Sequence, residues 1–219
     1  MQVTSLVLIS LALAIGYGLG SYRVSSLQNR GEALVRREIM AHFNGPEFHL
    51  LNHVTLKLKD GTTEIDHILV SPFGVFVIET KDYRGWIFAN AKSATWTQVL
   101  YKAKFKFQNP IFQNMRHVRA VAELLDFLPV SAIKSVVVFS GDSKFKTDIP
   151  PSVLKLSQLA KHLKSAMTTD VVISPNRVQF CVGRLEMARL QISKETDIEH
   201  VESLQRRHGT PKSPRRAHP

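Results

Sequence analysis

Cysteine is almost absent from the 219-residue sequence, in which Cys181 is the single residue of this type. One cysteine excludes an intramolecular disulfide and a cysteine-based zinc site. The sequence also has no Walker A loop and no serine or cysteine nucleophile motif, so neither ATP use nor covalent hydrolysis has support. The nine histidines show no convincing metal-ligand spacing. What remains open is chemistry that relies on carboxylates and basic residues.

Acidic residues are missing from one long stretch of the chain. From Tyr83 to Ala122 no Asp or Glu occurs, while Lys and Arg recur throughout. The formal net charge of +11 and the pI of about 10.0 indicate an anionic partner such as nucleic acid or lipid headgroups. Lysines alternate with small or aromatic residues from position 102 to 107, which predicts a strand with one basic and one apolar face. A merely solubilising surface is the alternative. The residues expected to contact nucleic-acid phosphates are Lys102, Lys104, Lys106 and Arg116.

A β-hairpin is predicted between Thr63 and Lys81. The segment is dense in Val, Ile and Thr, and Pro72-Phe73-Gly74 supplies the turn residues. A loop centred on the Pro-Phe pair sets Asp66 directly across from Glu79, with Cβ atoms roughly 4.5–5.5 Å apart. Lys81 follows Glu79 by two residues and therefore lies on the same face.

Two carboxylates that face each other are destabilising unless one is protonated or a cation lies between them. Two carboxylates and a nearby backbone carbonyl offer the hard oxygen ligands that Mg²⁺ or Mn²⁺ prefers. A lysine beside them can orient the attacking water and offset charge on a phosphate. The alternative is an exposed strand face on which Asp, Glu and Lys form a local ion network. The spacing alone leaves both interpretations open.

An ordered set of short motifs surrounds the hairpin. It comprises Gly31-Glu32, Ile65-Asp66-His67, Ser71 to Gly74, Ile78-Glu79-Thr80-Lys81, Gly85, Trp96, Asn109-Pro110 and Gln113-Asn114. In this order the motifs resemble the nuclease-related domain (NERD) family, a branch of the PD-(D/E)XK phosphodiesterase superfamily. The resemblance covers about residues 31–128.

This resemblance implies specific roles. The implied metal ligands are Asp66, Glu79 and the backbone carbonyl of Thr80, and the implied ion is Mg²⁺ or Mn²⁺. Lys81 is expected to serve the attacking water, with two auxiliary polar residues nearby. The implied catalytic set is Asp66, Glu79, Lys81, Glu32 and Gln113.

The auxiliary Glu32 falls on a predicted helix from Gly31 to Phe43. It extends the mostly apolar stripe that contains Val35 and Ile39, where a carboxylate needs a partner. A first-turn glutamate favoured by the helix dipole is the alternative.

The auxiliary Gln113 falls on a second predicted helix, which Asn109 caps and Pro110 opens. Gln113 lies beside Arg116 and His117 on a polar face, which faces either a site or solvent. The predicted core stripe of this helix is Ile111, Met115, Val118, Ala122 and Leu125.

The N-terminus has no charged residue from Val3 to Tyr22, and apolar residues dominate it. About 20 such residues span the hydrocarbon core of a bilayer. A cleaved signal peptide is the alternative, but no Lys or Arg precedes the run, which is also long for such a peptide. Arg23 and Arg30 follow the run, so the positive-inside rule places the N-terminus outside and the soluble domain in the cytoplasm. We therefore predict a single-pass anchor at residues 3–22 in the cell (inner) membrane.

The C-terminal half is less informative. The pattern predicts a strand over residues 135–140, a polar loop over 141–151 and a short helix that includes Val153 and Leu163. Residues 171–173 and 178–182 look strand-like, with a helix from Gly183 to about Ile192. Residues 203–219 contain no acid and are rich in Arg, Lys and Pro, which is typical of a basic disordered tail.

These observations predict an α/β fold. The resemblance implies a restriction-endonuclease-like mixed sheet flanked by helices, over residues 27–192. The predicted function is membrane-anchored, metal-dependent hydrolysis of nucleic-acid phosphodiester bonds, with DNA favoured over RNA. One alternative is a catalytically inactive, membrane-tethered nucleic-acid-binding module. Another is a structural or sensory membrane protein whose basic surface lies on anionic lipid.

Overall fold

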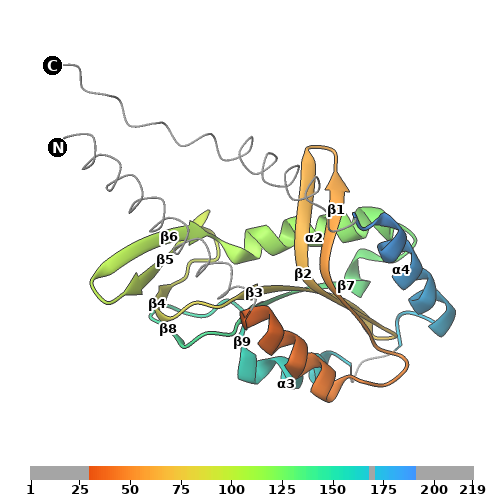
Figure 1. Cartoon of the computed structure of the whole chain (residues 1–219), viewed down its shortest axis with the longest axis horizontal. Coiled ribbons are helices and arrows are strands. Elements are labelled where there is room, and N and C mark those ends of the chain that lie inside the picture. The colour runs from red at the N-terminus through yellow and green to blue at the C-terminus, as the bar shows by residue number, and fades with distance from the viewer. Residues whose placement is uncertain (1–29, 168–170, 191–219) are drawn as a thin grey trace, which may run out of the picture. The chain divides into compact units, whose positions relative to one another are not determined.

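The computed structural model describes residues 30–167 and 171–190 (Figure 1). The predicted membrane span at residues 3–22 and the predicted tail at 203–219 lie outside these ranges. Within the described ranges, no helix is both long enough and apolar enough to cross a membrane. The chain divides into two compact units, each assembled from three segments. Of the described residues, the first unit takes in 30–44, 80–109 and 137–165, and the second takes in 45–79, 110–136, 166–167 and 171–190.

One β-sheet has the strand order β1-β2-β3-β7-β9, of which β1, β2 and nearly all of β3 belong to the second unit and β9 to the first. The strands are β1 (His49–Leu58), β2 (Gly61–Ser71), β3 (Gly74–Lys81), β7 (Ile133–Phe139) and β9 (Val153–Lys155). Neighbours β1–β2 and β2–β3 are antiparallel, whereas β7 and β9 are parallel, so the sheet is mixed as predicted. Strand β3 is buried at every position before Lys81, which explains its nearly continuous apolar sequence.

Helices α2 (Pro110–Leu124) and α4 (Pro175–Ala188) pack on one face of this sheet (Figure 1). A short 3₁₀ turn, η1 (Val130–Ala132), leads into β7. The shared core contains Ile68, Val77, Val121 and Leu185, all fully buried. Burial of each such side chain contributes about 1.5–3 kcal/mol, so this layer supplies most of the stability of the unit.

The predicted core stripe of α2 is only partly confirmed. Leu125 is fully buried in the core and Val118 and Ala122 pack against it, but Met115 is 44% exposed. The helix also buries the polar residues Asn114 and His117. Hydrophobicity alone does not predict the burial of Asn114, whose amide nitrogen lies 2.9 Å from the Val77 carbonyl oxygen and 3.0 Å from that of Val136. A polar side chain with such partners can be buried without a large penalty.

The two strands predicted at residues 171–173 and 178–182 were wrong, whereas the helix predicted from Gly183 is confirmed as far as Ala188. Residues 175–188 form the single helix α4, and residues 171–173 are not a strand. Pro175 occupies the first helical turn, and Val178, Cys181 and Leu185 recur at helical spacing on the buried side. The short apolar run around Cys181 resembled a strand because periodicity cannot separate a buried strand from one buried turn of helix.

The first unit contains a second mixed sheet, where the sequence had predicted only one. Its strand order is β6-β5-β4-β8, with antiparallel β4–β5 and β5–β6 pairs and a parallel β4–β8 pair. Trp96, 1% exposed, stacks on Phe139 and meets Phe107 and Phe145 edge-on. The strands are β4 (Gly85–Phe88), β5 (Thr95–Leu100), β6 (Ala103–Gln108) and β8 (Ser143–Phe145).

The first unit also contains two helices. The helix over residues 30–42 buries Val35 and Ile39 fully, as predicted. Helix α3 (Leu156–Ala166) buries Leu159 and Leu163, but Val153 belongs to β9 and not to this helix.

The thiol of Cys181 provides a direct test of the α4 packing. The side chain is fully buried, and this burial raises the pKa of the thiol. Since the thiolate is the reactive form, we expect iodoacetamide to modify the native protein far more slowly than the guanidinium-unfolded protein. The folded thiol also stays protonated where the unfolded thiol ionises, so its contribution to stability declines as the pH rises above the ordinary thiol pKa. Equal alkylation rates in native and unfolded samples, measured by mass spectrometry, would contradict this packing.

Candidate functional site

The β2–β3 hairpin has the predicted register. Five consecutive pairs are formed, from Ser71 with Gly74 at the turn to His67 with Ile78. The paired stretch ends at His67 and Ile78, and Asp66 and Glu79 are the next residues outward on β2 and β3. At the turn, the Ser71 hydroxyl donates to the Gly74 carbonyl at 3.1 Å. Gly74 has a φ of 137°, which side chains rarely adopt, so glycine is required where the hairpin reverses.

Both candidate metal ligands are buried. Asp66 is 9% exposed and Glu79 is 1% exposed. Moving two carboxylates out of water raises the free energy of the folded state unless nearby charges or hydrogen bonds replace their lost hydration. The interpretation of this pair as part of an exposed, solvated strand face is therefore wrong.

A histidine from α2 contacts the buried Glu79. Nε2 of His117 lies 3.0 Å from Oε2 of Glu79, and Nδ1 of His117 lies 2.8 Å from the Thr63 hydroxyl. With a proton on Nε2 the ring donates to the carboxylate, and the Thr63 hydroxyl can donate to or accept from Nδ1, so both contacts are satisfied. The side chains of His117 and Glu79 are 4% and 2% exposed. The structure thus adds Thr63 and His117 to the candidate site.

The side chain of Thr63 reaches His117 because the side chains of β2 do not alternate regularly between the two faces of the sheet. Ile65 and Ile68 both belong to the core under α2, although residues three apart on a regular strand face opposite sides. On the neighbouring strand β1, Leu51 and Val54 share the same irregularity, and His53 between them has a φ of 51°. The interruption falls in the stretch that carries Asp66, and strained backbone of this kind clusters at functional sites.

Helix α2 is fastened to the sheet directly beside this site. Asn114 lies one helical turn before His117, and its amide nitrogen meets the carbonyl oxygens of Val77 on β3 and Val136 on β7. These contacts fix the rotation of α2, so that His117 points at Glu79 while Gln113 is half-buried. Gln113 and His117 are four residues apart and therefore lie on the same face of the helix. This spacing indicates a polar buried face, but the hydrophobicity pattern alone favours a different one.

The other predicted catalytic residues belong to the first unit. Glu32, on the helix over residues 30–42, is 5% exposed, as expected from its position on the apolar stripe. The last two residues of β3 are Thr80, which is 6% exposed, and Lys81, which is half-buried. Glu79 and Lys81 occupy alternate positions of this strand, so both project to the same side of it.

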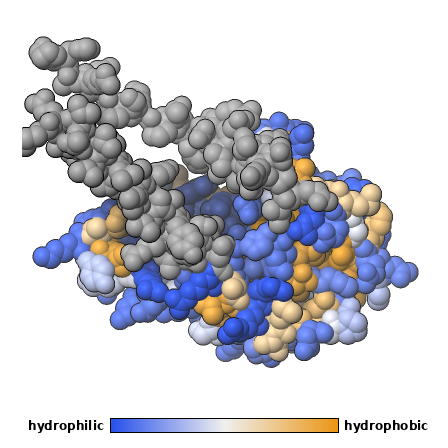
Figure 2. All heavy atoms as spheres, viewed as in Figure 1, coloured by the Kyte–Doolittle hydropathy of each residue, from blue (hydrophilic) through white to orange (hydrophobic). Residues whose placement is uncertain are grey.

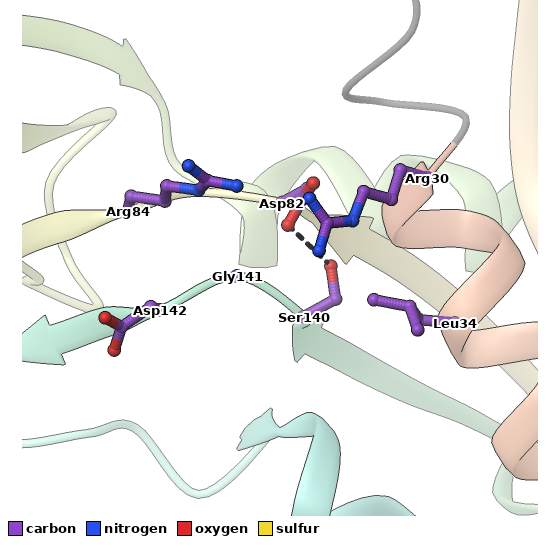
Figure 3. Close-up of a pocket in the computed structure, with 7 residues that line it drawn as sticks. All are labelled: Arg30, Leu34, Asp82, Arg84, Ser140, Gly141 and Asp142. Atoms are coloured by element: carbon purple, nitrogen blue, oxygen red, sulfur yellow. Dashed lines mark hydrogen bonds between the residues drawn. The ribbon is translucent and has the colours of Figure 1, made fainter.

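A pocket of about 210 Å³ lies in the first unit, beside the residue that follows Lys81. Figure 3 shows the guanidinium of Arg30 pointing toward the Asp82 carboxylate, and the Ser140 hydroxyl donates to Oδ1 of Asp82 at 3.4 Å. Oδ2 of Asp82 is buried without a hydrogen-bond partner among the described residues. A Cβ placed on Gly31 would lie 2.6 Å from Oγ of Ser140, which explains a glycine here. The pocket lining is Arg30, Leu34, Asp82, Arg84, Ser140, Gly141 and Asp142.

The predicted phosphate-contacting residues differ in their surroundings. Lys104 and Lys106 are exposed on β6, and Lys102 lies in the turn before that strand rather than in it. Arg116 is engaged with Asp60, whose two carboxylate oxygens both lie 3.0 Å from the Nη2 atom of Arg116. Among the described residues, no group of three or more His, Cys, Asp or Glu side chains is arranged to hold a metal ion.

Comparison with known proteins identifies the family of the chain. The nuclease-related domain family, NERD, matches residues 27–140, just over half of the chain. An uncharacterized protein of Bacillus anthracis is 34% identical over 185 residues, which cover 80% of this chain and 82% of the relative. No solved structure matches. The chain therefore belongs to the nuclease-related domain family, and a PD-(D/E)XK-like assignment is consistent with this membership.

The His117–Glu79 contact can be tested by its effect on stability. Replacement His117→Phe removes the ring nitrogens and leaves a buried carboxylate and a buried hydroxyl without this partner. We expect the free energy of unfolding to fall by about 1–3 kcal/mol, as measured by denaturant titration. The same substitution in a Glu79→Leu background should cost clearly less, because the carboxylate is then absent.

The matched control for this experiment is Arg119→Ala, on the exposed side of the same helix. It should change stability by no more than about 0.5 kcal/mol. If His117→Phe costs the same in both backgrounds, the two side chains are not coupled and the contact contributes nothing to the fold.

Proposed function

We propose that this protein is a metal-dependent nuclease that hydrolyses phosphodiester bonds of nucleic acid, with DNA as the favoured substrate. The observation that carries the proposal is the burial of two carboxylates, Asp66 and Glu79, on the neighbouring strands β2 and β3 of a nuclease-related domain. A domain gains little stability from burying two acids on adjacent strands, so their presence supports a functional role.

The donor chemistry of the hairpin suits Mg²⁺ or Mn²⁺. Asp66, Glu79 and the carbonyl of Thr80 offer only hard oxygen donors, which these ions prefer over nitrogen and sulfur. Such an ion, when bound, lowers the pKa of a coordinated water and offsets negative charge on a phosphate. His117 holds the Glu79 carboxylate in one orientation, as partners of ligating carboxylates do in metal sites.

The remaining predicted residues have roles that follow from their chemistry. Lys81 projects to the same side of β3 as Glu79, so its ammonium orients the attacking water or stabilises charge on the phosphate. Glu32 and Gln113 are auxiliary polar groups, a buried acid and a half-buried amide. The exposed Lys104 and Lys106 contribute contacts to the phosphate backbone, together with Lys102 and Arg116.

A catalytically inactive nucleic-acid-binding module is the second candidate function. One observation favours it: Oε2 of Glu79 is already engaged by His117 at 3.0 Å. In this alternative the histidine replaces the cation as the partner of the carboxylate. Binding to DNA would then be sensitive to salt but indifferent to divalent metal.

Substitution of the two acids distinguishes the two candidates. Asp66→Asn and Glu79→Gln remove a ligand charge at nearly constant volume. We expect each to lower Mg²⁺-dependent cleavage of plasmid and single-stranded DNA by more than about 100-fold. The assay uses the full chain in neutral-detergent micelles, with Mg²⁺, Mn²⁺ and EDTA compared.

The exposed Asp126→Asn serves as the matched control and should cleave like the unmodified protein. Circular dichroism verifies that each variant is folded. Undiminished cleavage by both folded acid variants would refute the nuclease assignment. Metal-independent binding without any cleavage by the unmodified protein would establish the second candidate.

We further propose that residues 3–22 anchor the protein in the cell (inner) membrane as one helix, with the N-terminus outside and the soluble domain in the cytoplasm. The support is the length of the uncharged run and the arginines that follow it.

Membrane anchoring predicts a specific fractionation behaviour. The full chain, expressed in bacterial cells, should stay in the membrane pellet after alkaline carbonate washing, whereas a chain without residues 1–22 should be released. A C-terminal tag on the full chain should resist protease added to intact spheroplasts. Release of the full chain by carbonate would show peripheral attachment, and cleavage of the tag would reverse the proposed orientation.

A further inference from the structure

The sheet of the first unit has two chemically different faces. Its inner face carries Trp96, Ile87 and Phe145, of which the first two are buried. Residues at the alternate positions of the same strands project from the opposite face. In β4 these are Trp86, which is 49% exposed, and Phe88, which is 39% exposed. Two large aromatic rings thus lie two residues apart on an open sheet surface.

The strand registers place lysines on both sides of Trp86 and on one side of Phe88. Trp86 pairs with Lys144 on β8 and with Val99 on β5, and Val99 pairs with Lys104 on β6. Phe88 pairs with Thr97, which pairs with Lys106. With strands about 4.8 Å apart, each ring has a β6 lysine roughly 10 Å away across the sheet. The aromatic face, as we call this surface, consists of Trp86, Phe88, Thr97, Val99, Lys104, Lys106 and Lys144.

The aromatic face carries charge of one sign only. The four strands that form it contain no Asp or Glu, and Lys104, Lys106 and Lys144 are exposed. On the face of the molecule that Figure 2 shows, hydrophobic and hydrophilic residues are interspersed where the grey atoms do not cover them. A partner that fits must therefore offer flat apolar groups and regularly spaced negative charges at the same time.

One lysine already contacts a ring of this surface. Nζ of Lys146 lies 4.5 Å from the centroid of the Trp86 ring. An exposed cation–π contact is weaker than stacking of a base on an aromatic ring, so a base can displace this ammonium. The displaced lysine stays within reach of the adjoining phosphate.

We propose that the aromatic face binds single-stranded nucleic acid, with unpaired bases stacked on Trp86 and Phe88 and the phosphates near the flanking lysines. The inference rests on the proposed nuclease function for the choice of substrate, and it narrows that substrate to unpaired strands. A duplex keeps its bases stacked on each other, so their flat faces cannot reach rings on a sheet. Stacking also tolerates any sequence, because every base has such a face.

Anionic lipid fits this surface less well. An amphipathic helix that lies in the membrane interface buries a broad apolar face in the acyl boundary. The aromatic face exposes only two large rings among its lysines, which offers little apolar area for such burial. Tyr101, 96% exposed at the tip of the β5–β6 hairpin with a φ of 56°, adds another ring beside Lys102.

The chain contains two tryptophans, and this allows a direct optical test. Trp96 is 1% exposed, so quenching of tryptophan emission by a bound strand reports on Trp86. The full chain in neutral-detergent micelles is titrated with an oligothymidylate of about 20 nucleotides, longer than one typical strand-binding site. EDTA in the buffer prevents metal-dependent cleavage, so the readout is binding alone.

We expect saturable quenching, and binding at least about tenfold weaker to a duplex of the same length. Trp86→Leu and Phe88→Leu should each weaken binding by about tenfold, as followed by anisotropy of a labelled strand. Trp86→Phe keeps a ring and should bind with nearly full affinity but without quenching. Phe112→Leu, an exposed aromatic on α2, is the matched control and should bind normally.

Three results would overturn the inference: unchanged affinity of both leucine variants, equal affinity for the duplex, or quenching by phosphatidylglycerol micelles but not by the strand. Its failure is separable from failure of the nuclease proposal. If the protein binds the strand through Trp86 but never cleaves it, the binding proposal is supported and the nuclease proposal is refuted. If it cleaves DNA equally well without Trp86 and Phe88, the nuclease proposal is supported and the binding proposal is refuted.

Discussion

Burial of the Glu79 carboxylate is the constraint on which the candidate site depends. The side chain is 2% exposed, and a charge removed from water needs a partner of good geometry. His117 meets this need at 3.0 Å and is in turn positioned by Thr63 at 2.8 Å. The rotation of α2 that the Asn114 contacts fix is also the one that brings His117 to this acid. The packing of this helix on the sheet thus depends on polar contacts as well as on apolar burial.

The motif Asn-Pro-x-x-Gln-Asn, at residues 109–114, holds a loop and attaches a helix to the sheet. Asn109 is fully buried, and its side-chain nitrogen lies 2.8 Å from the Ser93 carbonyl oxygen and 3.4 Å from that of Asn90, so it holds the loop between β4 and β5. Pro110 starts α2, and Asn114 attaches that helix to β3 and β7. The half-buried Gln113 lies between these structural residues. Most of the motif thus supports the architecture, and its polar character alone does not mark each member as catalytic.

The sequence predicts those parts of the fold that depend on residues close together in the chain. The turn residues and the β-branched runs were sufficient to predict the hairpin register, and Asn-Pro marked the start of α2. The rest depends on contacts distant in sequence. The buried face of α2 follows from carbonyl groups of β3 and β7 that accept from Asn114, and the second sheet follows from the packing of rings around Trp96. The role of His117 was missed for the same reason, since its partner Glu79 lies 38 residues away in the chain.

Gly31 shows how a missing side chain can matter at a distance. The helix over residues 30–42 begins so close to Ser140 and Asp82 that an added methyl group would lie 2.6 and 2.7 Å from their atoms. Alanine at this position would push the start of the helix outward, and the next residue, Glu32, would move with it. The position of Glu32 thus depends on residue 31 having no side chain. Substitution of Glu32 itself would not reveal this steric dependence.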